Sequence, residues 1–160
     1  MPDRALAAGI QEIQLASFRL GDVCYAVDIM RIREIIRPQK LTALPKSPAF
    51  IEGVLNLRGM VIPVIDLRKR FELPAKEIDG STRLLIVSVA RQSMGLMVDD
   101  VTEVINVPVK DIKPPPQLND GESAAYLIGV CLVQEAMVML LNIDRLLTDR
   151  EVDELGGFTP

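Results

Sequence analysis

Two segments of the chain match each other without a gap, and this internal repeat constrains the fold more than any other feature. One constant offset pairs residues that mark backbone breaks: Ser47 with Ser123, Gly53 with Gly129, and Asp66 with Asn142. A slightly smaller offset pairs Glu34 with Glu103 upstream. Glycines and capping residues are better evidence of a repeat than aliphatic runs, because they set local backbone geometry. The chain therefore contains two similar units of roughly 70 residues each.

Alternating apolar and polar residues predict that both units are built from short β-strands. The expected strands lie at residues 16–20, 23–27, 32–36, 53–57, 60–66, 84–89, 95–98, 101–107, 126–133 and 136–141, with short helices at 47–53 and 67–73. Units this small bury little apolar surface alone, so we expect them to pack against each other. Each should close into a small twisted barrel, because closure limits exposed strand edges. With no Trp and 4% aromatic residues, the shared core must be aliphatic.

The hairpin at residues 53–66 carries conspicuous polar side chains. Arg58-Gly59 is typical of a tight turn between two β-rich runs. Asn56 and Arg58 alternate with leucines, so both point to one face of the first strand. In the second unit the equivalent positions carry neither the Asn nor the Arg. This asymmetry predicts that partner specificity lies in the first unit.

Composition argues against most catalytic chemistry. The chain has no His, so the commonest general base and the commonest metal ligand are missing. Its two cysteines, Cys24 and Cys131, stand far apart in sequence. Asp99 and Asp100 are neighbours on a predicted strand and point to opposite faces, so they make a poor carboxylate pair. We therefore expect no enzymatic activity, no cofactor and no metal.

Charge and hydropathy narrow the partners. A net charge of −4, with no aromatic residues among the basic groups near 31–40 and 68–70, argues against nucleic-acid binding. The longest apolar runs are far shorter than the roughly 18 residues that span a bilayer, and no signal peptide is recognisable. We expect a cytoplasmic protein without direct membrane insertion.

Several motifs together resemble the CheW family of chemotaxis coupling proteins. They occur in the family's order, at residues 18–21, 29–35, 48–53, 56–59, 61–67, 95–99 and 142–147. Together they cover about residues 15–148. The Asn56-Leu57-Arg58-Gly59 hairpin, followed by a strand that contains Pro63, is the most specific of them.

The resemblance implies one CheW-like domain at residues 13–148, made of two intertwined five-stranded SH3-like β-barrels around a shared hydrophobic core. The first barrel would centre on residues 18–73 and the second on 83–142, with an N-terminal arm at 1–12 and a C-terminal tail at 149–160. It also implies a non-enzymatic adaptor that couples chemoreceptors (methyl-accepting chemotaxis proteins) to the CheA histidine kinase. In the family, the receptor's cytoplasmic hairpin tip docks in the groove between the barrels, and the second barrel pairs with the kinase's CheW-like regulatory domain.

The resemblance also assigns residues. The receptor-binding and structural positions fall on Ile32, Glu34, Gly53, Val54, Asn56 and Arg58. Among these, Glu34 and Arg58 match an acidic–basic pair, and Ile32 matches an apolar position implicated in receptor binding. Gln117 and Leu118 match the loop that joins couplers and kinases into rings, where the family often has an acidic residue followed by an aromatic one.

Alternatives stay open at this point. Glu34 and Arg58 could form a purely structural ion pair, or a pair that also shapes the receptor surface. A small nucleic-acid-binding β-barrel is a second class of function, motivated by the basic residues at 31–40. A CheW-like adaptor of a non-chemotaxis pathway, for pili or a second messenger, would use the same scaffold.

Overall fold

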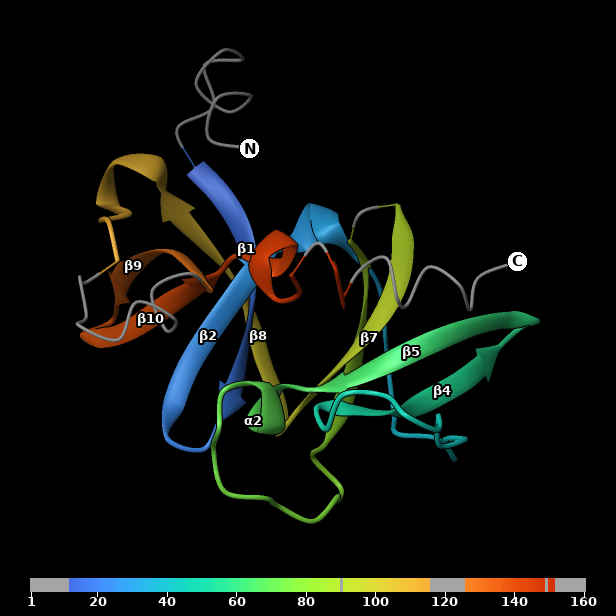
Figure 1. Cartoon of the computed structure of the whole chain (residues 1–160). Helices are drawn as coiled ribbons and strands as arrows, with labels where there is room; N and C mark the ends of the chain where they lie inside the picture. The colour runs from blue at the N-terminus through green and yellow to red at the C-terminus, as the bar shows by residue number, and fades with distance from the viewer. Residues whose placement is uncertain (1–11, 90, 116–125, 149, 152–160) are drawn as a thin grey trace.

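The computed structural model describes residues 12–89, 91–115, 126–148 and 150–151, and Figure 1 shows the arrangement of the chain. The strands are β1 (Glu12–Leu20), β2 (Val23–Asp28), β3 (Ile32–Ile36), β4 (Ile51–Leu57), β5 (Met60–Asp66), β6 (Arg83–Val89), β7 (Gln92–Val98), β8 (Asp100–Pro108), β9 (Leu127–Val133) and β10 (Ala136–Leu141). The helical elements are short: η1 (Ile29–Arg31), α2 (Leu67–Arg70), η2 (Val109–Asp111) and η3 (Ile143–Arg145). Within the described ranges, no helix is both long and apolar enough to cross a membrane.

The strands form two five-stranded sheets that lie side by side (Figure 1). Sheet A has the order β8-β1-β2-β10-β9, and sheet B has the order β3-β6-β7-β5-β4. Each sheet therefore takes two strands from one repeat unit and three from the other. The two units join in each sheet through one parallel pair, β2 with β10 in sheet A and β5 with β7 in sheet B, and through one antiparallel pair, β1 with β8 and β3 with β6.

This exchange of strands changes the meaning of the ranges expected from the sequence. Residues 18–73 and 83–142 delimit repeat units, whereas sheet A combines residues 12–28 with 100–141 and sheet B spans 32–98. The reason is the very short connections after β2 and β7, which carry the chain from one sheet directly into the other.

The repeat itself is confirmed in three dimensions. An isolated bridge joins Thr42 to Val54 in the first unit, and the equivalent bridge joins Lys113 to Val130 in the second. The two equivalent hairpin turns share positive φ angles, at Arg58-Gly59 and at Gln134-Glu135. The same backbone solution thus occurs twice.

Three hydrophobic clusters support the sheets. One lies inside sheet A and includes Leu15, Cys131 and Leu140, and a second lies inside sheet B and includes Leu55 and Ile86. The largest is shared, because it contains residues from both sheets: Ala16, Phe18, Leu20, Val27, Ile65, Leu85, Val87, Leu96, Leu141 and Leu146, among others. The fold class predicted from the sequence, a mainly β protein of two five-stranded subdomains around a largely aliphatic shared core, is confirmed.

The helix predicted at residues 47–53 is wrong. The segment forms a single turn, closed by a 3.0 Å hydrogen bond from the Ile51 amide to the Pro48 carbonyl, and β4 then begins at Ile51. The Ser47 hydroxyl donates to the Leu44 carbonyl and does not cap a helix. Tertiary pairing of β4 with β5 outweighs the local helix-start signal of Ser47-Pro48.

The helix predicted at 67–73 exists but is shorter. Asp66 caps it as expected, accepting a 2.9 Å hydrogen bond from the Arg68 amide, and regular α-helix ends at Arg70. In the second unit, η3 replaces this helix, and its N-cap Asn142 makes no side-chain capping bond. The matched caps therefore share a position and differ in the bond they make.

Candidate partner-binding site

Most of the predicted receptor-binding residues lie on or next to the two edge strands of sheet B, β3 and β4. Arg58, in the turn after β4, donates to both carboxylate oxygens of Glu34 on β3, at 3.3 Å to Oε1 and more closely to Oε2. Farther along, Thr42 and Val54 exchange two backbone hydrogen bonds of 2.9 and 2.8 Å. We call this line of contact, from the Glu34–Arg58 pair to the Thr42–Val54 bridge, the β3–β4 seam. It links the two edges of sheet B through one side-chain ion pair and a bridge from the segment after β3.

The ion pair at the seam faces solvent. The Arg58 side chain is 70% exposed and that of Glu34 is 31% exposed. The hydrogen-bonded Arg58 guanidinium lowers the pKa of the Glu34 carboxyl, so both groups are charged at neutral pH. An exposed pair of this kind adds little to stability. Its exposure leaves both charges accessible to a partner.

Asn56 fixes the hairpin that presents Arg58. Its side-chain oxygen accepts a 2.9 Å hydrogen bond from the Gly59 amide. Arg58 (φ 53°) and Gly59 (φ 88°) then both adopt positive φ, the geometry of the tight turn that suits a twisted hairpin. Asn56 therefore acts on the site through the backbone of the turn.

Gly53 permits the closest backbone approach at the seam. A Cβ atom at this position would lie 2.5 Å from the Thr42 carbonyl oxygen, and φ is +151°. The neighbouring residue, Val54, makes both hydrogen bonds to Thr42. Gly53 is thus needed for seam closure and does not end a helix.

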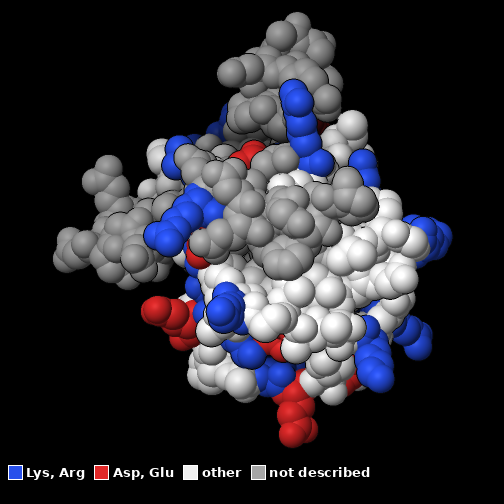
Figure 2. Space-filling view, turned by 45° about the vertical axis from the view of Figure 1, so that its right-hand side comes forward, with Lys and Arg blue, Asp and Glu red and all other residues white. Residues whose placement is uncertain are grey.

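Apolar residues adjoin the seam. Ile32 is half-buried and packs against the shared core, so it belongs more to the scaffold than to an open surface. Ile35 lies on the same face of β3 as Ile32, because the register with β6 shifts between Ile32 and Glu34, and it is 44% exposed. Figure 2 shows a broad area without charged side chains on the right-hand part of the visible face, with charged groups at its borders. Gln117 and Leu118 lie outside the described residues.

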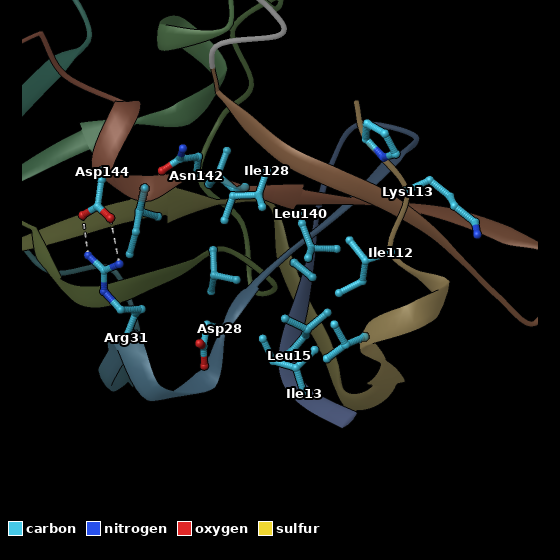
Figure 3. Close-up of a pocket in the computed structure, with 16 residues that line it drawn as sticks. Ile13, Leu15, Asp28, Arg31, Ile112, Lys113, Ile128, Leu140, Asn142 and Asp144 are labelled. Carbon is cyan, nitrogen blue, oxygen red and sulfur yellow. Dashed lines mark hydrogen bonds and ion pairs between the residues drawn. The ribbon is translucent and has the colours of Figure 1, made fainter. Parts of the chain in front are cut away.

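Sheet A carries a separate cavity of about 280 Å³. Its lining is largely aliphatic, and Figure 3 shows Ile13, Leu15, Ile112 and Leu140 gathered on one side. On the other side lies the pair formed by Arg31 and Asp144, with hydrogen bonds of 2.6 and 3.0 Å. Composition and charge did not predict this cavity, because its walls come from residues far apart in sequence.

Two further arginines connect parts of the fold that the sequence did not link. Arg68 donates to both oxygens of Asp99, at 2.7 and 2.5 Å, and Asp99 also accepts from the Gly21 amide at 2.7 Å. The sequence shows Asp99 only as a neighbour of Asp100 and does not indicate Arg68 as its partner. The signal that identifies Arg68 is its place after β5, which runs parallel to the strand that precedes Asp99.

Arg70 joins the repeat-equivalent aromatic residues. Its guanidinium lies 4.3 Å from the ring centroid of Phe50 and 5.4 Å from that of Tyr126. It also donates to Glu151, at 3.2 and 3.4 Å. Cation–π contacts of this kind stabilise a partly buried guanidinium, and the ion pair with Arg70 holds Glu151 against the junction of the two units.

The described part of the chain contains no group of three or more His, Cys, Asp or Glu side chains placed to hold a metal ion. Burial raises the pKa of both thiols, Cys24 and Cys131, which makes them weak nucleophiles at neutral pH. The arrangement offers surfaces, ion pairs and a cavity, and these suit binding.

Comparisons with known proteins agree with this geometry. A family model described as a CheW-like domain matches residues 14–151. The chain is 33% identical to the chemotaxis protein CheW of Treponema pallidum (strain Nichols) over 156 residues, covering 95% of this chain and 92% of that protein. It is 39% identical to protein FrzA of Myxococcus xanthus over 150 residues, covering 91% and 92%. The crystal structure of the scaffolding protein TtCheW from Thermoanaerobacter tengcongensis is similar with a TM-score of 0.80 at 33% identity, covering 87% of this chain and 90% of that one.

Proposed function

This chain belongs to the family of CheW-like domains, and on that premise we propose how it couples chemoreceptors to a CheA-type histidine kinase. The family's members are non-enzymatic adaptors, so the activity to be explained is geometric: one protein holds two partners in register. The observation that carries the proposal is that the protein has two separate surfaces, a solvent-exposed charged seam on sheet B and an apolar cavity on sheet A. Two distinct surfaces allow two partners to bind together and influence each other.

We assign the receptor to the β3–β4 seam. The cytoplasmic hairpin tip of a chemoreceptor is helical, and a helix in a groove binds through apolar anchors flanked by charges. The Glu34–Arg58 pair supplies a charged contact, and exposed Ile35 supplies an apolar contact on the other face of the same edge strand. Four other predicted residues support this surface: Ile32 by packing against the core, Gly53 and Val54 by the contact with Thr42, and Asn56 by fixing the turn.

Arg58→Ala is expected to weaken receptor binding by about tenfold or more while changing the melting temperature little. The side chain is largely exposed, so its loss removes a contact surface more than a structural support. Affinity for receptor tips and thermal melting should be measured on the same preparations. Arg19→Ala, an exposed arginine on sheet A, is the matched control and should leave both unchanged.

The charge-exchanged double variant, Glu34→Arg with Arg58→Glu, separates the two roles of the pair. Recovery of binding would mean that the receptor needs only a closed seam, and continued loss would mean that it contacts Arg58 itself. If the Arg58→Ala variant bound receptor tips and melted like the wild-type protein, the assignment of this hairpin would be contradicted.

We assign the kinase's CheW-like regulatory domain to sheet A, at the cavity beside the Arg31–Asp144 pair. An apolar cavity with a charged rim accepts an apolar side chain from a protein partner and fixes its orientation. We expect Gln117 and Leu118 to take part in ring formation, as the resemblance to the family implies. Because the family often has an acidic residue followed by an aromatic one there, we expect weaker ring formation by this chain.

Ile128→Glu is expected to reduce kinase-domain binding about tenfold and to leave receptor binding intact. Ile128 lines the cavity and is 49% exposed, so a carboxylate there is tolerated by the fold and unfavourable to an apolar partner. Met60→Glu, at 48% exposure on sheet B, is the matched control and should not affect the kinase. An equal loss of kinase-domain binding in the Ile128→Glu and Met60→Glu variants would contradict the assignment of the kinase to this cavity.

The function as a whole is tested by reconstitution. Added to receptor-containing vesicles and a CheA-type kinase, the protein is expected to place kinase autophosphorylation under receptor control. Failure to bind either receptor tips or a CheW-like kinase domain would overturn the proposal. We place the protein on the cytoplasmic side, recruited to receptors through these partners.

A nucleic-acid-binding barrel is not favoured. Each member of the basic group at 68–70 is paired with a carboxylate: Arg68 with Asp99, Lys69 with Glu52, and Arg70 with Glu151. In the group at 31–40, Arg31 is likewise paired with Asp144, whereas Arg33, Arg37 and Lys40 are exposed. Cations that are already neutralised do not form the concentrated positive surface that phosphate binding needs.

A further inference from the structure

Neither repeat unit can close a sheet by itself, because its internal connection is too short. In sheet A, β8 begins beside Arg19, at the end of β1 opposite to the end where β2 finishes beside Leu15. For β3 to take that place in its own unit, the chain after β2 would have to run about 13 Å along the sheet and about 10 Å across it. Only the three residues Ile29–Arg31 are available, and at the equivalent connection after β7 there is only Asp99. Each unit must therefore exchange strands with another unit.

Two partners could satisfy that requirement. One is the other unit of the same chain, as the structure shows. The other is the same unit of a second copy, in which β2 would pair with β5 and β7 with β10. Because the two units share strand lengths and turn geometry, backbone shape alone discriminates poorly between these partners.

The charges at the ends of the parallel strands discriminate between them. Where β2 and β10 end side by side, Arg31 pairs with Asp144, and where β7 and β5 end, Asp99 pairs with Arg68. In the repeat, Arg68 of the first unit is equivalent to Asp144 of the second, and Arg31 is equivalent to the residue next to Asp99. The Arg68–Asp99 pair therefore has the same position as the Arg31–Asp144 pair, with the two charges exchanged between the units.

We propose that these two reversed ion pairs select closure between unlike units and oppose strand exchange between like units of two copies. Pairing of two first units would bring Arg31 against Arg68, and pairing of two second units would bring Asp99 against Asp144. Arg68 and Asp99 are only 15% and 13% exposed, and like charges buried to that degree repel strongly. Correct intramolecular pairing thus places opposite charges together at both connections.

Two double variants of equal net charge test this. Arg68→Asp with Asp144→Arg makes both native pairs repulsive and both like-unit pairs attractive. Arg31→Asp with Asp144→Arg keeps both native pairs attractive. After refolding at several protein concentrations, size-exclusion chromatography with light scattering should find the first variant mainly as dimers or larger species and the second mainly as a monomer.

A fourfold variant guards against simple misfolding. Arg31→Asp, Arg68→Asp, Asp99→Arg and Asp144→Arg together invert every charge and restore attraction in both native pairs, so the monomer should return. Identical oligomeric states and refolding yields for the two double variants would overturn the proposal. So would failure of the fourfold variant to recover the monomer.

Discussion

Gly53→Ala is expected to lower the free energy of unfolding by about 3 kcal/mol or more and to abolish receptor binding. The new Cβ would lie 2.5 Å from the Thr42 carbonyl oxygen and 3.0 Å from its carbon, both of them backbone atoms that cannot rotate away. The φ of +151° is itself unfavourable for any residue with a side chain. The strand must then separate from Thr42, which opens the β3–β4 seam. Urea unfolding and receptor pull-down on the same protein measure both effects.

Three other glycines provide controls for this result. Gly129→Ala should be nearly as damaging, because its Cβ would lie 2.5 Å from the Lys113 carbonyl oxygen in the equivalent bridge of sheet A. Gly59→Ala meets no neighbouring atom and should cost only its backbone strain at φ +88°, about 1 kcal/mol. Gly80→Ala meets open space and should be close to neutral. Equal stability of the Gly53 and Gly80 variants would show that the close approach is relieved at no cost.

The same glycines show what the sequence could and could not predict. The match of Gly53 with Gly129 revealed the repeat correctly. The helix predicted at residues 47–53 would end at Gly53, and this was wrong, because the glycine is required by a close approach to Thr42, a residue outside the local pattern. Spacing along the chain reports local geometry well, and it carries little information on which distant backbone comes close.

Strand exchange was beyond the sequence for a similar reason. Alternation of apolar residues located the strands closely, since each needs one buried face. Which strands pair depends on the path of the chain between them, and that path is determined by very short connections, such as the single residue Asp99 between β7 and β8. The short connections were visible in the sequence, but their consequence appears only once the register of β1 with β8 is known.

The candidate site was predicted in part. Alternation placed Asn56 and Arg58 on one face, and the resemblance to a known family paired Arg58 with Glu34, which the structure brings together. The partner-binding role of these residues stays a prediction. Arg68 and the sheet A cavity were missed, because both depend on strands that only the folded topology places side by side.

Asp99→Asn is expected to lower the free energy of unfolding by about 3 kcal/mol at pH 7. It would leave the Arg68 guanidinium, 15% exposed, without its carboxylate partner. The hydrogen bond from Arg68, aided by the Gly21 amide and a weaker attraction to Lys76, lowers the pKa of the Asp99 carboxyl below its ordinary 3.8. A carboxyl with a lowered pKa in the folded state stabilises the protein above its unfolded-state pKa. That contribution disappears as the pH falls through the folded-state value.

The stability gap between wild type and Asp99→Asn should therefore be full at pH 5 to 7 and narrow progressively below about pH 4. Urea unfolding of both proteins at several pH values measures it. Asp144→Asn is the matched control: its carboxyl is 59% exposed, so its loss should cost at most about 1 kcal/mol. A gap that stayed constant down to pH 3 would show that Asp99 acts through shape alone. A gap that closes would identify the buried Arg68–Asp99 pair as the charge interaction that fixes sheet B, through Gly21, to the β1–β2 turn of sheet A.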